Sequence, residues 1–143
     1  MSNIVLTRID QRLIHAQVTL QWCGALNVEA ILVVNDEVAN HPLRQSLMRK
    51  ATPNHVEVIF TSVEDAIHKI QETNQRLFVL CENPFDALKL IEANVSINKI
   101  NIGDISISDA EKEAYKQLYS KGIELEMKSL PHIASEDIQF LFK

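Results

Sequence analysis

The sequence of 143 residues contains few of the residues that build loops and crosslinks: three glycines, four prolines and two cysteines. So little glycine and proline leaves no room for a linker, and we expect one domain spanning residues 1–143. Two cysteines cannot make a disulfide framework. Both Cys23 and Cys81 lie in apolar sequence, which favours buried free thiols in a reducing compartment. We therefore expect a cytoplasmic protein.

The sequence also has no long apolar run. The longest ones, residues 30–34 and 77–81, have the length of strands and fall far short of the roughly 20 residues that cross a membrane. The first residues show neither the basic segment nor the cleavage site of a signal peptide. The protein is therefore not expected to span a membrane itself.

Basic residues and phosphate-binding glycine motifs are scarce as well. A net charge of −5 argues against a nucleic-acid-binding protein. A nucleotide-binding module would need a Gly-x-Gly-x-x-Gly turn or a Gly-Lys-Ser/Thr loop, and the sequence has neither. No cofactor is expected. Nor is a metal site, because most of the histidines have no ligand-like spacing to one another or to the cysteines: His41, His55, His68 and His132.

Strand-like and helix-like segments alternate along the chain. Strands are expected at residues 3–9, 28–34, 56–60, 77–81, 97–102 and 123–127, and helices at residues 15–25, 42–50, 84–92 and 135–142. The strands are apolar on both sides, which is typical of parallel strands covered by helices on both faces. We predict a doubly wound α/β fold with a mostly parallel sheet of about six to seven strands.

Two further helices are predicted from their capping signals. Thr61 with Glu64, and Ser108 with Glu111, have the spacing of a capping box, in which a hydroxyl and a carboxylate bond each other's backbone N–H groups. Gly122 suits the position just after the end of the second of these helices.

Polar residues gather where the first strand gives way to a helix: Arg8, Asp10, Arg12, His15 and Gln17. In doubly wound folds ligands bind beyond the carboxyl ends of the strands. Arginine donors suit phosphate oxygens, and a histidine at a helix N-terminus holds an anionic adduct close to open N–H groups. The set offers a nucleophile, charge stabilisation and orientation, which phosphoryl transfer requires.

From these residues alone a plainer reading stays open. Arg8 and Asp10 can form a surface ion pair, and His15 can be an ordinary helix-start residue. The same holds for Asn35 and Asp36, which follow the second strand at the same sheet edge. They can shape the site, or Asn35 can simply cap the next helix.

The segment Arg8-Ile-Asp-Gln-Arg-Leu-Ile-His-Ala-Gln-Val18, followed by Trp22, resembles the active-site signature of a known family. These are the IIB components of the mannose/fructose/sorbose family of the phosphoenolpyruvate-dependent sugar phosphotransferase system. Further segments are similar to that family in the same order, including Ile100-Asn-Ile-Gly103 and the residues around Asn35, which lean toward its N-acetylgalactosamine branch.

The resemblance implies a phosphoryl relay. His15 accepts the group from the phosphohistidine of a IIA partner and passes it to a hexose or amino sugar held by the membrane components IIC and IID. Arg8 and Arg12 contact phosphate oxygens or the partner, Asp10 orients the imidazole or an arginine, and Gln17 adds a donor. The protein then works at the membrane transporter without spanning the bilayer.

Two departures from the family pattern stand out. Ala16 replaces a usual glycine, which matters if the position needs a positive φ. The connection after Gly103 is shorter by about a dozen residues than the family pattern that the segment resembles. These departures raise the alternative of a regulatory or binding domain of the same fold that has lost transfer activity.

Overall fold

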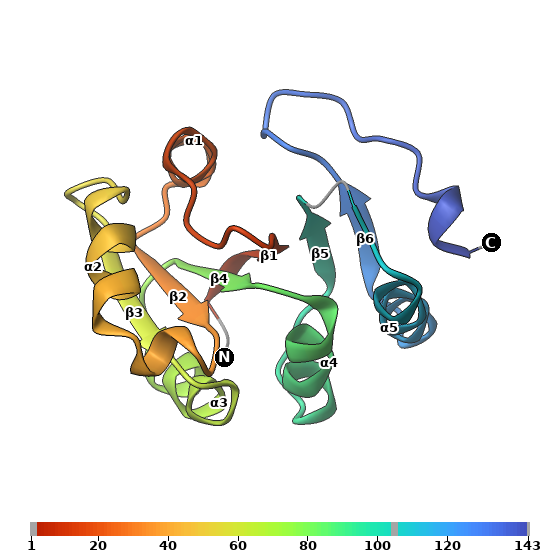
Figure 1. The fold of residues 1–143 in the computed structure, drawn as a ribbon, viewed down its shortest axis with the longest axis horizontal. Coiled ribbons are helices and arrows are strands. Elements are labelled where there is room, and N and C mark those ends of the chain that lie inside the picture. Colours follow the sequence, from red (N-terminus) through yellow and green to blue (C-terminus); the bar gives the residue numbers. More distant parts are fainter. Residues whose placement is uncertain (1–2, 104–105, 143) are drawn as a thin grey trace.

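The computed structural model describes residues 3–103 and 106–142 (Figure 1). Within these residues six parallel strands form one sheet in the order β3-β2-β4-β1-β5-β6. The strands are β1 (Ile4–Ile9), β2 (Ala30–Val34), β3 (Glu57–Thr61), β4 (Leu77–Cys81), β5 (Lys99–Ile102) and β6 (Glu124–Met127). The helices are α1 (Ala16–Leu26), α2 (Pro42–Lys50), α3 (Val63–Glu72), α4 (Pro84–Glu92) and α5 (Asp109–Ser120), with 3-10 turns η1 (Val38–Asn40) and η2 (Gln139–Phe142). The predicted doubly wound α/β fold is confirmed.

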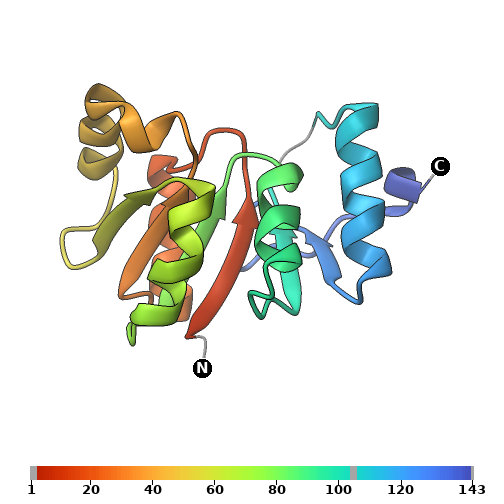
Figure 2. The same cartoon turned by 90° about the horizontal axis from the view of Figure 1, so that it is seen from below.

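Helices cover both faces of the sheet. Helices α1 and α2 lie on one face, and Figure 2 shows α3, α4 and α5 side by side over the other. Every residue of β2 and β4 is buried, because the side chains on both faces of these strands pack under helices. This explains the continuous apolar runs that the sequence shows at these strands.

The direction of winding reverses beside β1. The chain leaves β1 through α1 and α2 toward β2 and β3, and it reaches β4, β5 and β6 through α3, α4 and α5 (Figure 1). The connections that follow the neighbouring strands β1 and β5 therefore run over opposite faces. Such a reversal opens a crevice at the carboxyl ends of the two strands, which is where doubly wound folds bind ligands.

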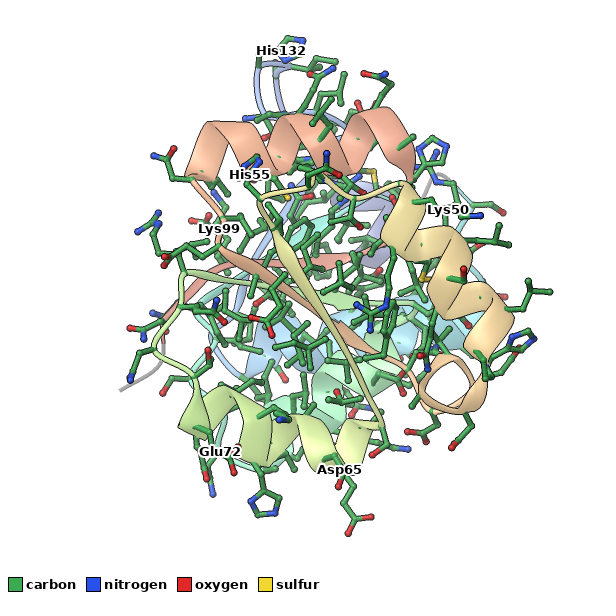
Figure 3. All side chains as sticks on the ribbon, turned by 90° about the vertical axis from the view of Figure 1, so that its left-hand side faces the viewer. Lys50, His55, Asp65, Glu72, Lys99 and His132 are labelled. Atoms are coloured by element: carbon green, nitrogen blue, oxygen red, sulfur yellow. The ribbon has the colours of Figure 1, made fainter. Side chains whose placement is uncertain are left out.

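No helix of the described residues lies over β5 and β6 on the face of α1. Instead residues 128–138, which we call the C-terminal strap, return along this face; Figure 3 shows His132 of the strap on the side of α1. The Glu136 N–H donates to the Met127 carbonyl at 2.8 Å, and the indole N–H of Trp22 in α1 donates to the Ser129 carbonyl at 3.1 Å. The strap is thereby joined to both β6 and α1.

The capping signals give one confirmation and one correction. The Ser108–Glu111 capping box is present, and Gly122 follows the helix end with φ of 89°. The box predicted at Thr61 is wrong: β3 runs one residue further, and the Thr61 carbonyl accepts the Asn35 N–H at 2.9 Å. The helix therefore begins after Ser62, whose hydroxyl accepts the Asp65 N–H at 3.1 Å.

The terminal helix predicted over residues 135–142 is also wrong. Glu136 pairs antiparallel with Met127, which keeps this part of the strap extended, and only Gln139–Phe142 form a 3-10 turn. Strands β2 and β5 begin two residues later than expected, at Ala30 and Lys99. None of the helices in the described ranges is long and apolar enough to cross a bilayer.

Replacing Ser62 by alanine tests the observed helix start. Loss of the N-cap hydroxyl is expected to lower the free energy of unfolding by about 1 kcal/mol. Chemical denaturation measures the change. Thr61→Val is the control, since the buried Thr61 hydroxyl has no hydrogen-bond partner in the described part of the chain and valine matches its shape. Equal losses in the two variants would contradict the assignment of Ser62 as the cap.

Candidate active site

The loop between β1 and α1 is anchored to the protein core. The Leu13 N–H donates to the Asp10 carbonyl at 2.9 Å and closes a tight turn, in which Leu13 has φ of 56°. The side chains of Leu13 and Ile14 are buried in the same apolar cluster as Trp22 of α1. A non-glycine residue at positive φ persists only where its surroundings hold it, and here the burial of Leu13 and Ile14 does so.

His15 lies at the N-terminal end of α1. Its backbone is extended, with φ of −134° and ψ of 98°, and the helix has no side-chain N-cap and no acidic residue in its first turn. The His15 N–H donates to the Thr19 hydroxyl at 2.8 Å, which ties the residue to the next turn. The exposed imidazole therefore stands at the positive end of a helix whose first N–H groups face the site.

Ala16 is the first residue of α1, and its φ is not positive. The replacement of the usual glycine therefore introduces no backbone strain. Alanine is also the residue that best favours a helix. Of the two departures from the family pattern, this one leaves the loop geometry intact.

Asp10 joins two arginines. Its Oδ1 accepts from the backbone N–H and from Nε of Arg12, both at 3.0 Å, and its Oδ2 accepts from Nη2 of Arg12 at 2.9 Å. Oδ2 also accepts from Nη2 of Arg8 at 3.3 Å. Burial by itself raises the pKa of this carboxyl, but the hydrogen bonds from Arg12 and the charges of both arginines outweigh it and hold the pKa below its ordinary value.

The hydrogen bonds given above join the Asp10 carboxylate to arginines. The carboxylate is 1% exposed, whereas the Arg12 side chain is 49% exposed. Bidentate pairing fixes the plane of the Arg12 guanidinium, so Arg12 reaches the surface in one orientation. A carboxylate enclosed in this way does not face an incoming phosphate.

Arg8 lies in the interior, not at the surface where a phosphate-binding arginine was expected. The side chain is 1% exposed, and its guanidinium lies over the Trp22 ring at 5.5 Å. Nη1 donates to Oδ1 of Asn101 and, at 2.8 Å, to the Lys128 carbonyl. Nη2 donates to the Ser129 carbonyl at 3.3 Å. Arg8 thus connects β1 to β5, to α1 and to the strap.

Because Gly103 has no side chain, it leaves room for the guanidinium of Arg8 and the carboxylate of Asp10. A Cβ atom on Gly103 would lie 2.3 Å from Nη2 of Arg8 and 2.7 Å from Oδ2 of Asp10. The backbone at Gly103, just after β5, therefore lies close against the ion pair. This is a close approach that only glycine permits.

The remaining predicted residues lie farther along the same edge. Gln17 lines a hollow of about 330 Å³ together with Arg12, Gly103 and the strap residue Ser129. The Asn35 side chain caps the η1 turn by accepting the Val38 N–H at 2.9 Å. Because β4 lies between β2 and β1, residues that follow β2 are about 10 Å from the end of β1.

The Asp36 side chain likewise bonds the backbone, since its carboxylate accepts the Val63 N–H at 2.8 Å.

Cys23 and Cys81 are buried free thiols, as expected. Burial raises the pKa of Cys23 to about 11, and it raises the pKa of Cys81 further. Across residues 3–103 and 106–142 no three His, Cys, Asp or Glu side chains stand together as a metal site would require.

Sequence reasoning missed the role of Asn101 and of the strap carbonyls. Asn101 is 1% exposed and lies between two buried isoleucines of β5. A polar residue in the middle of an apolar strand was the available signal. The strap carbonyls left no signal, because any residue supplies a backbone oxygen.

Residues 4–143 match the family described as the PTS system sorbose subfamily IIB component. The chain belongs to this IIB family. It is 33% identical over 153 aligned residues to N-acetylgalactosamine-specific phosphotransferase enzyme IIB component 2 of Escherichia coli K12, covering 96% of this chain and 98% of the relative. It is 34% identical to the mannose-specific EIIAB component of the same strain, covering 89% of this chain and 44% of that protein.

The fold of this IIB chain also agrees with a solved IIB structure. The IIB domain of the sorbose permease from Klebsiella pneumoniae superposes with a TM-score of 0.89 at 30% identity, covering 99% of this chain and 96% of that chain. The family predicted from the first loop is therefore confirmed. The chain is a IIB component of the sugar phosphotransferase system, a phosphotransferase domain, and nothing supports the alternative of a domain that has lost transfer.

The comparisons bear on two finer points. The relatives are named for three different sugars at identities of 30–34%, so similarity alone favours none of these sugars. The alignment of 153 residues exceeds the 143 of this chain, so that relative has at least ten residues that this IIB component lacks. The expected shortening after Gly103 involves residues 104–105, which lie outside the described residues.

Gly103→Ala tests the close approach of the backbone after β5 to the ion pair. The new methyl group must displace Arg8 or Asp10, and such overpacking is expected to cost about 1–3 kcal/mol of the free energy of unfolding. Gly24→Ala is the control, because a Cβ there meets no atom within 4 Å and alanine should stabilise α1 by up to about 1 kcal/mol. Chemical denaturation of both variants decides; a Gly103→Ala protein as stable as the parent would contradict the geometry.

Asp10→Asn tests the carboxylate through pH. Because the folded-state pKa of Asp10 lies below its unfolded value, its stabilisation is complete above the unfolded pKa and is lost as pH falls through the folded one. At pH 7 the variant is expected to be less stable by about 3 kcal/mol, since Arg8 loses its charged partner. Below about pH 4 the difference should shrink.

Thermal unfolding between pH 2 and 7 measures this convergence. Glu113→Gln, which removes an exposed carboxylate from α5, serves as the control for a change in net charge. A stability difference between Asp10→Asn and the parent that stays constant over the whole range would show that the carboxylate is not stabilised by its arginines.

Proposed function

We propose that this IIB component carries a phosphoryl group on His15 and relays it between two partners. The donor is the phosphohistidine of a IIA component. The acceptor is a hydroxyl of a hexose or amino sugar bound by the membrane components IIC and IID. One observation carries the proposal: an exposed imidazole at the uncapped N-terminus of α1, in the same short loop as an arginine that a buried aspartate orients.

The electrostatics of the loop suit a phosphoryl group of about two negative charges. Arg8, Asp10 and Arg12 together carry a single net positive charge, and their one carboxylate is buried between the two guanidinium groups. The N–H groups of the first turn of α1, which no side chain of the N-cap residue caps, add partial positive charge beside His15. These groups hold their positions before the phosphoryl group arrives, so little reorganisation is needed.

The relay consists of two displacements at phosphorus. A ring nitrogen of His15 attacks the phosphoryl group of the donor, and the P–N bond to the donor histidine breaks as the new P–N bond forms. The hydroxyl oxygen of the sugar then attacks the same phosphorus, the bond to His15 breaks, and the hydroxyl proton passes to solvent or to the released imidazole. Catalysis of such transfers consists mainly of positioning and charge stabilisation.

The other residues take separate roles in this proposal. Arg12 contacts the phosphoryl oxygens at the surface, and Gln17 adds a donor from the first turn of α1. Arg8 acts from the interior, through its charge and through Asp10, without touching the phosphate. Asn35 and Asp36 shape the adjoining edge of the sheet and hold its turns.

The partners follow from the same relay. The mannose relative is named as an EIIAB component, which supports a IIA protein as the source of the phosphoryl group. A sugar taken up through IIC and IID receives it on the cytoplasmic side, where this chain binds the transporter peripherally. Both partners must reach His15, and its exposed position at the sheet edge permits this.

The proposal is tested with labelled phosphoenolpyruvate. The protein is incubated with the general phosphotransferase proteins and a IIA partner, and label that is acid-labile and alkali-stable is expected on the parent protein. His15→Ala should abolish this label. His68→Ala, which removes an exposed histidine from α3 on the far face of the sheet, should retain it. Absence of label from the parent, or its persistence in His15→Ala, would overturn the proposal.

A further inference from the structure

Asn101 is a buried amide between two charged groups. It faces away from its neighbours Ile100 and Ile102, which belong to the core under α4 and α5. Its Oδ1 accepts from Nη1 of Arg8, which is its register partner on β1. Its Nδ2 donates to Oε2 of Glu126 on β6 at 3.3 Å. The amide thus turns its oxygen to the cation and its N–H group to the carboxylate.

Contacts on several sides hold the guanidinium of Arg8. Asn101 and the Lys128 carbonyl accept from Nη1, while Asp10 and the Ser129 carbonyl accept from Nη2. The Arg8 Cζ also lies over the Trp22 ring, 5.5 Å from its centroid. Among these acceptors Asn101 is the side chain on β5, so it is the contact that holds the guanidinium on the β5 side.

The same contacts continue to the surface. Arg8 bonds Oδ2 of Asp10, and Asp10 bonds Arg12 at its backbone N–H, its Nε and its Nη2. A displacement of Arg8 therefore moves Asp10, and with it the one arginine of the loop that reaches the surface. An unbroken series of hydrogen bonds joins Asn101, in the interior, to Arg12.

We propose that Asn101 is a positioning residue for phosphoryl transfer, acting through Arg8 and Asp10 on the orientation of Arg12. The proposal rests on the function proposed above for His15. It assigns Asn101 no contact with the phosphoryl group. Its effect is to hold the surface arginine in the orientation in which its donors meet the phosphoryl oxygens.

The chemistry of the side chain also matters. An aspartate at position 101 would keep an oxygen acceptor for Arg8 but add a negative charge beside Glu126 and close to the loop. Asparagine instead supplies a neutral acceptor, so at this position Arg8 gains a hydrogen bond from β5 without a second carboxylate beside it. A neutral acceptor thus orients the arginine without reducing the positive potential at His15.

The test compares Asn101→Ala, which removes the acceptor, with Asn101→Asp, which keeps it. Two quantities are measured: the rate of His15 phosphorylation by a phosphorylated IIA protein, and the NMR signal of the Arg12 Nε–H group, which is bonded to Asp10. In Asn101→Ala the Arg12 signal is expected to shift and broaden. The maximal rate should fall by about tenfold to a hundredfold, with a smaller change in KM for the donor.

In Asn101→Asp the Arg12 signal is expected to stay in place, with a rate reduced by less than in Asn101→Ala. Asn98→Ala is the matched control, since it removes an exposed asparagine just before β5 and should change neither quantity. If Asn101→Ala fails to fold, Asn101→Ser takes its place; the shorter hydroxyl withdraws from Arg8 and should shift the Arg12 signal in the same direction.

A folded Asn101→Ala or Asn101→Ser protein with an unmoved Arg12 signal and a rate within about twofold of the parent would overturn the proposal and leave Asn101 a purely structural residue. Failure of the proposed function looks different. In that case the parent itself takes no label on His15, while the Arg12 signal still reports whether Asn101 orients the arginine.

Discussion

The buried guanidinium of Arg8 is the constraint on which the edge of the sheet around the site depends. Removing an arginine from water costs several kcal/mol unless its donors are bonded and its charge is balanced. The neighbours of Arg8 meet this requirement: a carboxylate, an amide oxygen, two backbone carbonyls and an aromatic face. The need for these acceptors explains the asparagine in an apolar strand and the course of the strap beside β6. The space that the ion pair fills explains the glycine at position 103.

The topology explains why such a group is placed here. The chain winds in opposite directions from β1 and β5. The helices that follow these two strands, α1 and α5, therefore lie on opposite faces of the sheet, and polar groups can occupy the crevice between the strand ends. On the face of α1, the strap takes the place of a covering helix beside β5 and β6 and supplies carbonyls where a helix would supply apolar side chains. Its contact with Trp22 then ties the strap to the same helix whose N-terminus presents His15.

Much of the fold could be predicted from the sequence, because apolar runs and capping residues act locally. The Ser108 capping box and Gly122 were predicted correctly for this reason. The Thr61 box failed because the sheet ladder, a long-range interaction, extended β3 by one residue. The site likewise has a part that local sequence predicts and a part that depends on long-range contacts. The loop that carries His15 is contiguous and could be recognised, whereas the burial of Arg8 depends on Asn101, which is 93 residues away in the chain.

The two arginines of the loop divide the electrostatic task according to their exposure. Arg12 is half exposed, so its attraction for a phosphoryl group is weakened by water and by salt. The charge of Arg8 acts from a region of lower dielectric, where fields are screened less. In the proposed relay, a phosphoryl group that must leave as readily as it arrives gains from this division. There the surface arginine would bind the phosphoryl group through contacts that break with each transfer, while the buried arginine would supply a steady potential and hold the aspartate, and hence the surface arginine, in place between transfers.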